Sequence, residues 1–351
     1  MAKKDAAGAK PADAYDLEGV SAPDNNFVPE DIVNAVRAYK AHRDVRIIVD
    51  SCADFAPAVA DRLGVEVIGF PYVVDGVERT DDLWKSSTPA EFYDAMRAGA
   101  AVSTSAVTPG NYLEVFERAA QEGTPALYLG LTGGLSSSIR AAEQAADMVR
   151  EKYPDYELYV LDNLCPSATA ELLAIECVRL AGDGMTAAEL YEWAKDARYF
   201  IQGYFTLDSF DALSKGGRIP PAAAHLGAKL DIKPELSFDL NGALTLRGMH
   251  RGRRKALKAL ISDFKENFCG DLSMPVAIMS ADAEKDADWL ESHLRREKGY
   301  ESLIVIRSSI SPVIGSHVGP GMVAIGFWSG DRREKLSLTD RIARKVRGTQ
   351  E

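Results

Sequence analysis

The chain has 351 residues, of which 46% are hydrophobic and 26% are charged, and its formal net charge is −11. This length exceeds that of one average domain and suggests two, while the composition is that of a globular protein with a sizeable core. The excess of acidic residues argues against nucleic acid or an anionic membrane surface as the main partner.

The first 44 residues contain no long apolar stretch, so they predict neither a signal peptide nor a membrane anchor. We expect a disordered or helical leader over residues 1–44. No later segment approaches the roughly 20 apolar residues that a spanning helix needs, so we expect no integral membrane segment and leave open only a transient membrane contact. The four cysteines are scattered, so we expect reduced thiols, a cytoplasmic location and no metal site.

Residues 45–200 alternate short apolar runs with segments of helical periodicity. The pattern predicts strands at 45–49 and within 65–80, 125–131 and 157–163, each followed by at least one helix. Two threonines, Thr88 and Thr108, are each followed by a proline and predict helix starts. Strands that alternate with helices imply right-handed crossovers, and therefore a parallel sheet with helices on both faces.

Residues 201–351 have a different pattern. The Asn-Gly pair at 241–242 lies between two alternating runs and predicts a β-hairpin. An amphipathic helix, further strands and a terminal helix over 333–346 complete a mixed α/β unit. We therefore expect two domains, an N-terminal parallel α/β domain over 45–200 and a C-terminal mixed α/β domain over 201–351.

Polar residues follow several predicted strands at their carboxyl ends, where open parallel sheets bind ligands. Asp50–Ser51, Thr132–Ser138 and Asp162 occupy such positions. In the stretch LTGGLSSSIRAA, Ser136 and its two serine neighbours stand at a helix start, whose free N–H groups suit a carboxylate or a phosphate. A serine N-cap with spare surface hydroxyls is the alternative interpretation. The turn lacks the lysine of a nucleotide-binding P-loop.

Other segments carry further hydrogen-bond donors. STSAVTP places Thr104 and Ser105 before a helix, SKGGRIP places Arg218 after paired glycines, and IGSHVGPG brings His317 into a glycine-rich loop. Each segment also has a purely structural interpretation. STSAVTP fits an ordinary loop, SKGGRIP a tight turn with a surface arginine, and IGSHVGPG a loop whose histidine only makes a local hydrogen bond. A basic cluster over 247–258 is either a solvated junction or an anion-binding or docking patch. No nucleophile has an obvious base partner, so the donors indicate a site that holds an anion.

Taken in chain order, these segments resemble the DegV family from about Val45 to about Trp328. The resemblance rests on IIVDSCADF, STSAVTP, GLTGGLSSSIRAA, LDNLCPSATAELLA, the run from LSKGGRIP to RGRRKAL, and VIGSHVGPGMVAIGF. Each motif is weak alone, whereas their order and spacing are specific. The chain departs from the family pattern at residues 106–107, which replace Gln-Pro, at 136–139, which replace Ser-Gly-Thr-Tyr, and at Asn163, which replaces a serine.

The resemblance implies the two-domain DegV-like (EDD) fold with one long-chain fatty acid bound between the domains. It further implies a non-catalytic subunit with no cofactor and no nucleotide site. Such a subunit presents the fatty acid to a separate fatty acid kinase, which makes the acyl phosphate. The implied ligand-binding set consists of hydroxyls, two arginines and one histidine: Thr104, Ser105, Ser136, Ser137, Arg218, Arg251 and His317. The last three act either around the ligand or at the kinase contact.

Two other functions stay open at this point. A hydrolase or phosphoryl-transfer enzyme would use Ser136 or Ser138 together with His317. A small-anion sensor would bind a short polar ligand at the same hydroxyl-rich turns.

Overall fold

The computed structural model describes residues 44–220, 223 and 231–335, and all elements named below belong to them. Their strands form a four-stranded, a six-stranded and a three-stranded sheet. Apart from residue 44 and residues 333–335, the predicted leader and the predicted terminal helix lie outside the described residues.

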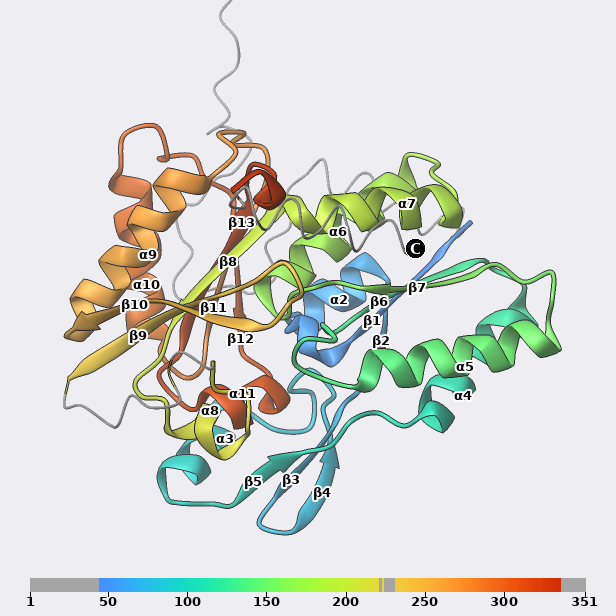
Figure 1. The fold of residues 1–351 in the computed structure, drawn as a ribbon, viewed down its shortest axis with the longest axis horizontal. Coiled ribbons are helices and arrows are strands. Elements are labelled where there is room, and N and C mark those ends of the chain that lie inside the picture. The colour runs from blue at the N-terminus through green and yellow to red at the C-terminus, as the bar shows by residue number, and fades with distance from the viewer. Residues whose placement is uncertain (1–43, 221–222, 224–230, 336–351) are drawn as a thin grey trace, which may run out of the picture.

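The four-stranded sheet is parallel throughout, as the alternation of strands and helices predicted, and its order is β2-β1-β6-β7. The strands are β1 (Arg46–Asp50), β2 (Glu66–Ile68), β6 (Ala126–Gly130) and β7 (Leu158–Asp162). The associated helices are α2 (Pro57–Leu63), α4 (Pro109–Glu122), α5 (Ser138–Lys152), α6 (Ala168–Gly182) and α7 (Ala187–Ala197). Figure 1 shows α4 and α5 on one side of this sheet and α6 and α7 on the other, so every residue of β6 is buried.

Two helix starts follow their sequence signals. The Thr88 hydroxyl accepts a hydrogen bond from the Glu91 N–H, and the Thr88 N–H donates to the Glu91 carboxylate, which forms a capping box at the start of α3 (Pro89–Arg97). The Thr108 hydroxyl likewise accepts from the Asn111 N–H at the start of α4. Both predictions are confirmed, because capping depends on residues that are close in sequence.

The three-stranded antiparallel sheet was not predicted. It consists of β3 (Pro71–Val74), β4 (Val77–Thr80) and β5 (Val102–Thr104), in the order β4-β3-β5. The turn at 75–76 has positive φ at both residues, as a tight hairpin requires. β5 spans three residues, which is too short for a periodic signal. The pairing places Thr104 opposite Tyr72.

The six-stranded sheet is mixed and has the order β10-β9-β8-β13-β11-β12. Its strands are β8 (Ile201–Thr206), β9 (Ile232–Phe238), β10 (Leu244–Arg251), β11 (Val276–Ser280), β12 (Val305–Ser309) and β13 (Val323–Trp328). β9 and β10 form the predicted hairpin around residues 241–242. The remaining helices are α8 (Asp211–Lys215), α9 (Arg253–Asn267), α10 (Glu284–Arg296) and α11 (Pro312–Val318), with short 3-10 turns at η2 (Ser51–Ala53), η3 (Arg198–Phe200) and η5 (Arg332–Lys335).

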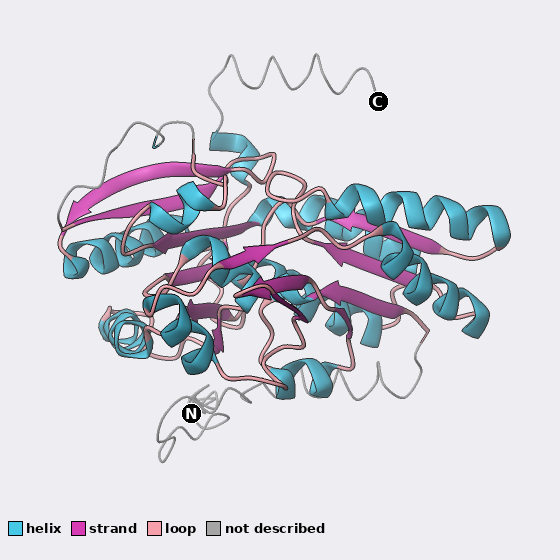
Figure 2. Ribbon diagram, turned by 90° about the horizontal axis from the view of Figure 1, so that it is seen from below, coloured by secondary structure: helices cyan, strands magenta, loops and turns pink. Residues whose placement is uncertain are grey.

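Helix α6 joins the two large sheets. It contacts β1 of the parallel sheet and β8, β11 and β13 of the mixed sheet. Most of its residues are buried and apolar, as expected for a helix that packs between two sheets. One hydrophobic cluster therefore extends from Val45 to Trp328. Figure 2 shows the strands running through the middle of the molecule with helices around them. The division into separate domains at residue 200 stays a prediction.

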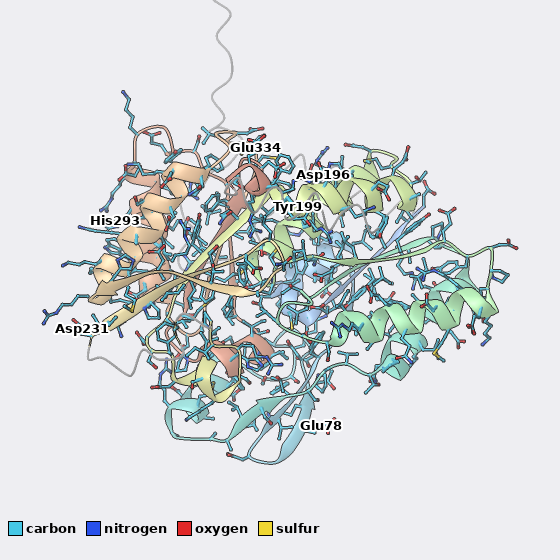
Figure 3. The ribbon with its side chains drawn as sticks, in the orientation of Figure 1. Glu78, Asp196, Tyr199, Asp231, His293 and Glu334 are labelled. Atoms are coloured by element: carbon cyan, nitrogen blue, oxygen red, sulfur yellow. The ribbon has the colours of Figure 1, made fainter. Side chains whose placement is uncertain are left out.

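Charged side chains lie on the outside of this core. The labelled residues Glu78, Asp196, Asp231 and Glu334 are all exposed, and Figure 3 shows them at the periphery of the molecule. Among the described residues, no helix combines the length and apolarity that crossing a membrane requires. All four cysteines are free thiols, and only Cys269 is exposed.

Candidate ligand-binding site

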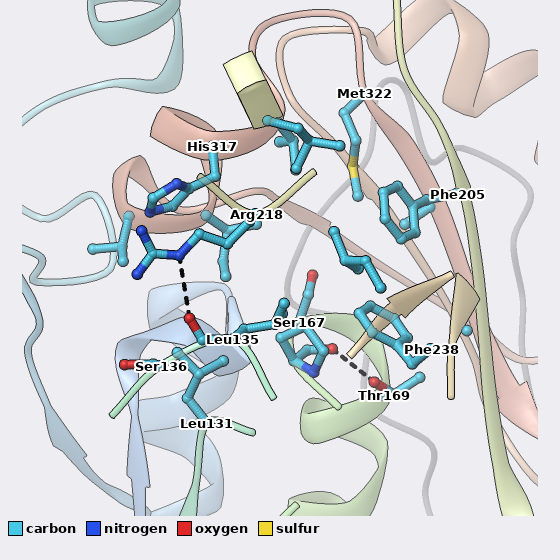
Figure 4. A pocket seen from close by; sticks show the side chains of 18 of the residues that line it. Leu131, Leu135, Ser136, Ser167, Thr169, Phe205, Arg218, Phe238, His317 and Met322 are labelled. Carbon is cyan, nitrogen blue, oxygen red and sulfur yellow. Dashed lines mark hydrogen bonds between the residues drawn. The ribbon is translucent and has the colours of Figure 1, made fainter. Parts of the chain in front are cut away.

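A mainly apolar cavity lies beyond the carboxyl edge of the parallel sheet. Its volume is about 110 Å³, several times the roughly 10–15 Å³ that one water molecule needs. Its walls come from the end of β5, the turn after β6, the first turn of α6, helices α8 and α11, and the inner face of the mixed sheet. Figure 4 shows Leu131, Leu135, Phe205, Phe238 and Met322 among the side chains around it.

The structure brings most of the predicted site residues to this cavity. The lining includes Thr104, Ser105, Ser136, Ser137, Arg218 and His317. Arg251 is the last residue of β10, where it pairs with Ile232; it is exposed and does not line the cavity. The roles of these residues toward a ligand stay predictions.

Thr104 and His317 form a pair of polar side chains in the cavity wall. The Thr104 hydroxyl lies 2.8 Å from His317 Nε2, although 213 residues separate the two in the chain. His317 was expected in a glycine-rich loop, but it lies in the last turn of α11, whose first turn is capped by the Ser311 hydroxyl. The Ser-Pro pair at 311–312 starts this short helix before the glycines.

His317 is neutral at pH 7. Burial, together with the positive charge of Arg218, lowers the pKa of its ring to about 4. Nδ1 is buried beside Gly216 and has no hydrogen-bond partner among the described residues. We therefore assign the ring proton to Nε2, from which it is donated to the Thr104 oxygen. The hydroxyl proton of Thr104 is then free to be donated to a ligand oxygen.

The three serines after β6 have different roles. Ser138 is fully buried, and its hydroxyl accepts a hydrogen bond of 3.2 Å from the Val107 N–H. Ser136 accepts from the Ser138 N–H at 3.2 Å and donates to the Ser138 hydroxyl at 2.9 Å. Ser137 takes the N-cap position of α5 without a side-chain capping bond. The side chain that accepts from the first N–H of α5 is thus that of Ser136, one residue before the N-cap. Ser136 and Ser137 both line the cavity.

Two carboxylates, the buried Asp50 and the half-buried Asp162, hold this turn in place. Asp50 accepts hydrogen bonds from the Leu131 N–H at 2.6 Å and the Tyr128 hydroxyl at 3.0 Å, and burial raises its pKa to about 6. Asp162 accepts from the N–H groups of Gly133, at 2.9 Å, and Leu164, at 2.8 Å. The polar strand ends found in the sequence therefore support the turn.

Arg218 connects two sides of the cavity at its exposed edge. Its Nε donates to the Leu135 carbonyl oxygen at 3.2 Å, as Figure 4 shows, and its Nη1 donates to the Gly216 carbonyl oxygen at 2.6 Å. The guanidinium places a positive charge near His317 and near any anion bound there.

The sequence did not single out Ser167, which precedes α6. It is 5% exposed, lines the cavity and stands in the segment CPSATAELL, where no periodic pattern marks it. Its place at the cavity follows from the packing of α6 between the sheets.

The described residues do not form a serine–histidine nucleophile pair at this site. Nε2 of His317 contacts Thr104, and Nδ1 has no partner. Nor do the described residues contain a group of three or more histidine, cysteine or acidic side chains arranged to hold a metal ion. The cavity's chemistry is that of neutral donors and one arginine beside apolar walls.

These features define a class: α/β proteins that enclose a mainly apolar ligand cavity beyond the carboxyl edge of a parallel sheet. The model of the DegV family, a family of uncharacterised proteins, matches residues 44–330. The chain belongs to the DegV family, which confirms the resemblance found in the sequence.

The match to this chain extends over nearly the whole length of its relatives. A DegV domain-containing protein of Clostridium perfringens is 31% identical over 288 residues, which are 82% of this chain and 98% of the relative. A structure from Thermotoga maritima, described as revealing a fatty acid binding function, is 28% identical with a TM-score of 0.69 and covers 81% of this chain and 99% of its own. The Streptococcus pneumoniae Fatty Acid Kinase B3 protein loaded with linoleic acid is 21% identical with a TM-score of 0.70, at the same coverage.

Proposed function

We propose that this protein binds one long-chain fatty acid in the cavity, with its carboxylate at the hydroxyls of Thr104 and Ser136. On binding, the Ser136 hydroxyl turns its proton from Ser138 to the carboxylate. The observation that carries the proposal is that a single cavity joins apolar walls to a cluster of neutral donors and one arginine. A fatty acid has the same division into an apolar chain and one anionic end. The solved relatives described as fatty acid binding support the proposal.

The energetics favour such a ligand. Each buried CH₂ contributes about 0.8 kcal/mol, so a sixteen-carbon chain gains roughly 10 kcal/mol before ordering costs. The carboxylate receives charge-assisted hydrogen bonds, which are stronger than bonds between neutral groups. Arg218 adds a positive charge at the exposed edge.

In this proposal the protein presents its bound acid to a separate fatty acid kinase and is not itself an enzyme. Ser105, Ser137 and Arg218 are exposed at the rim of the cavity, so a partner can approach the carboxylate from that side. Arg251, which is exposed and away from the cavity, fits the partner contact better than the ligand contact. The isolated chain is then expected to show no ATP turnover, whereas an enzyme that works alone would show it.

Native mass spectrometry of the purified protein and titration with palmitate or oleate test the proposal. We expect a bound long-chain acid, and we expect Thr104→Val and Ser136→Ala to weaken binding by about 1 kcal/mol each, which is roughly fivefold in affinity. Thr245→Val on β10, which does not line the cavity, is the matched control. Unchanged affinity in the double variant contradicts the carboxylate assignment.

A comparison of thermal unfolding with different ligands separates a small-anion sensor from a fatty acid carrier. A carrier is stabilised against thermal unfolding more by palmitate than by acetate at equal concentration, since stabilisation follows affinity. A larger shift with acetate overturns the fatty acid proposal.

A further inference from the structure

A chain of hydrogen-bonded hydroxyl groups leads from the cavity to the buried carboxyl of Asp50. It starts at Ser136, whose hydroxyl donates to that of Ser138 at 2.9 Å. Ser138 is in turn a side-chain hydrogen-bond partner of Tyr112, which partly offsets the rise that burial causes in the pKa of Tyr112. The hydroxyls of Tyr112 and Tyr128 lie 3.0 Å apart, and the Tyr128 hydroxyl donates to Asp50 Oδ2 at 3.0 Å.

The chain is closed to solvent except at its cavity end. Ser138, Tyr112 and Tyr128 are fully buried, and Asp50 is 2% exposed. Helices α4 and α5 lie on the same side of the parallel sheet (Figure 1), so their side chains meet there and reach β6. Of the residues in the chain, Ser136 lines the cavity and the others do not. A change at the cavity can therefore reach Asp50 through these hydroxyls.

The ionised carboxyl of Asp50 fixes the direction of every hydrogen bond in the chain, because each hydroxyl carries a single proton. The proton of Tyr128 points to Asp50, so Tyr112 donates to Tyr128. Ser138 then donates to Tyr112, and Ser136 donates to Ser138. In the protein without ligand, all these protons consequently point away from the cavity.

A carboxylate bound at Ser136 requires the opposite direction. When Ser136 donates to the ligand, the vacated oxygen positions are filled only if Ser138 donates to Ser136 and Tyr112 donates to Ser138. Tyr128 then donates to Tyr112 and no longer to Asp50. A buried carboxylate that loses a donor is stabilised by taking up a proton, which Asp50 can donate back to the Tyr128 oxygen.

We propose that this hydroxyl chain couples binding of the fatty acid carboxylate to the uptake of one proton by Asp50, with Tyr112 and Tyr128 as positioning residues. The inference rests on the proposed function, because it takes the carboxylate to lie at Ser136. The proton enters at the Ser136 oxygen, from the acid form of the ligand or from water. Each hydroxyl then passes its own proton to the next oxygen, and the last proton forms the O–H bond of Asp50.

The surroundings of Asp50 allow it to hold this proton. Besides the two phenols, the titratable groups that interact with it are the Cys52 thiol and the Asp54 carboxyl. Burial raises the pKa of the thiol and of both phenols, so these groups are neutral at pH 7. Burial also raises the pKa of Asp50 to about 6, and an ionised Asp54 adds a like charge.

Infrared difference spectroscopy of the full chain, loaded with palmitate or delipidated, tests the proton uptake at pH 7.5. We expect the loaded wild-type protein to gain a C=O band of a protonated carboxyl, and this band should not shift when the palmitate carboxyl carries ¹³C. Tyr112→Phe and Tyr128→Phe each interrupt the chain and should abolish the gain. Tyr156→Phe, at a half-buried tyrosine that donates to the Thr124 carbonyl oxygen and does not line the cavity, should keep it.

The pH dependence of affinity gives a second measurement. Uptake of one proton on binding makes the affinity for monomeric palmitate rise about tenfold per pH unit as the pH falls from 8 to 6.5, and the rise ends below the pKa of the free Asp50. His317, whose pKa is about 4, stays neutral over this range in the free protein. The dependence should be lost in Tyr112→Phe and kept in Tyr156→Phe.

The outcomes separate the two proposals. Palmitate binding without the band in the wild type, or with an equal gain in both chain variants, overturns this inference and leaves the proposed function intact. A band that shifts with the label shows that the ligand itself binds protonated, and it also overturns the inference. If Tyr128→Phe does not fold, Tyr112→Phe decides, since it leaves the bond from Tyr128 to Asp50 in place. Failure of the wild-type chain to bind palmitate overturns both proposals.

Discussion

His317 depends on the absence of a side chain at its neighbour. Nδ1 lies so close to Gly216 that a Cβ at this position would collide with the ring. Gly216 has φ −76°, which any residue can adopt. The glycine is therefore required for the space it leaves beside the imidazole, which holds Nε2 against Thr104.

Gly216→Ala should push the ring away from Thr104. We expect the pKa of His317 to rise from about 4 toward 6.5, because the displaced ring gains water, and fatty acid affinity to fall about fivefold. NMR titration of the histidine ring and a binding titration measure the two effects. Gly110→Ala in α4, whose Cβ would meet only the Thr108 hydroxyl at 3.8 Å, is the control. An unchanged pKa would show that the ring keeps its place.

The tip of the β9–β10 hairpin fastens the mixed sheet to the turn that carries the cavity serines. The Thr132 hydroxyl donates to the Gly242 carbonyl oxygen at 3.2 Å, and Arg332 donates to the carbonyl oxygens of Phe238 and Asp239 at 2.5 and 3.0 Å. Gly242 has φ 75°, and a Cβ there would collide with the Thr132 hydroxyl. Phe238, at the stem of this hairpin, lines the cavity, so the contact positions one cavity wall.

Gly242→Ala and Gly76→Ala separate backbone strain from collision. Both glycines have positive φ, but a Cβ at Gly76 meets nothing within 4 Å. We expect Gly76→Ala to lower the free energy of unfolding by about 1–2 kcal/mol through strain alone. Gly242→Ala should lower it by roughly a further 1–3 kcal/mol through overpacking. Urea unfolding measures both, and equal losses would contradict the close contact with Thr132.

Four carboxyl groups, those of Asp50, Asp54, Asp81 and Glu171, are buried in the fold. Burial raises the pKa of Asp50 to about 6 and those of Asp54 and Asp81 to about 7. The Asp54 carboxylate accepts from the Ser311 N–H at 3.0 Å, and its carbonyl oxygen accepts from the Ser308 hydroxyl. The carboxyl of Glu171, inside α6, also has a raised pKa because of burial. The folded molecule therefore binds protons more tightly than the unfolded chain.

Stability should consequently rise as the pH falls from 8.5 to 6.5. A carboxyl whose folded pKa is raised contributes stability that is present at low pH and is lost as the pH rises through the folded pKa. His317 acts in the opposite direction, because its pKa is lowered in the folded protein. Its contribution to the free energy of unfolding decreases as the pH falls below about 6.5, where the unfolded chain begins to protonate this histidine. We expect a net gain on the order of 1 kcal/mol in the free energy of unfolding at pH 6.5 relative to pH 8.5.

Asp54→Asn tests the source of this pH dependence. Asparagine keeps the shape of the protonated carboxyl and tolerates the left-handed backbone of Asp54, whose φ is 56°. The variant should therefore show a weaker pH dependence of the free energy of unfolding, whereas Asp155→Asn at an exposed position should keep that of the wild type. If Asp54→Asn keeps the pH dependence of the wild type, groups other than Asp54 cause it.

Local patterns in the sequence determined much of the fold. The alternation of strands and helices, the capping threonines and the Asn-Gly hairpin all depend on residues within a few positions of one another, so composition and spacing were enough to predict them. The order of short motifs along the chain was sufficient to recognise the DegV family. The polar turns after the strands also predicted where the cavity lies.

Tertiary structure alone decided how the site is assembled. The pairing of Thr104 with His317, the exclusion of Arg251 from the cavity and the inclusion of Ser167 depend on contacts between segments far apart in the chain. Such contacts result from the packing of two sheets around α6 and leave no periodic trace near the residues concerned. Sequence therefore determined which donors the chain carries, and packing determined which of them meet in one apolar cavity.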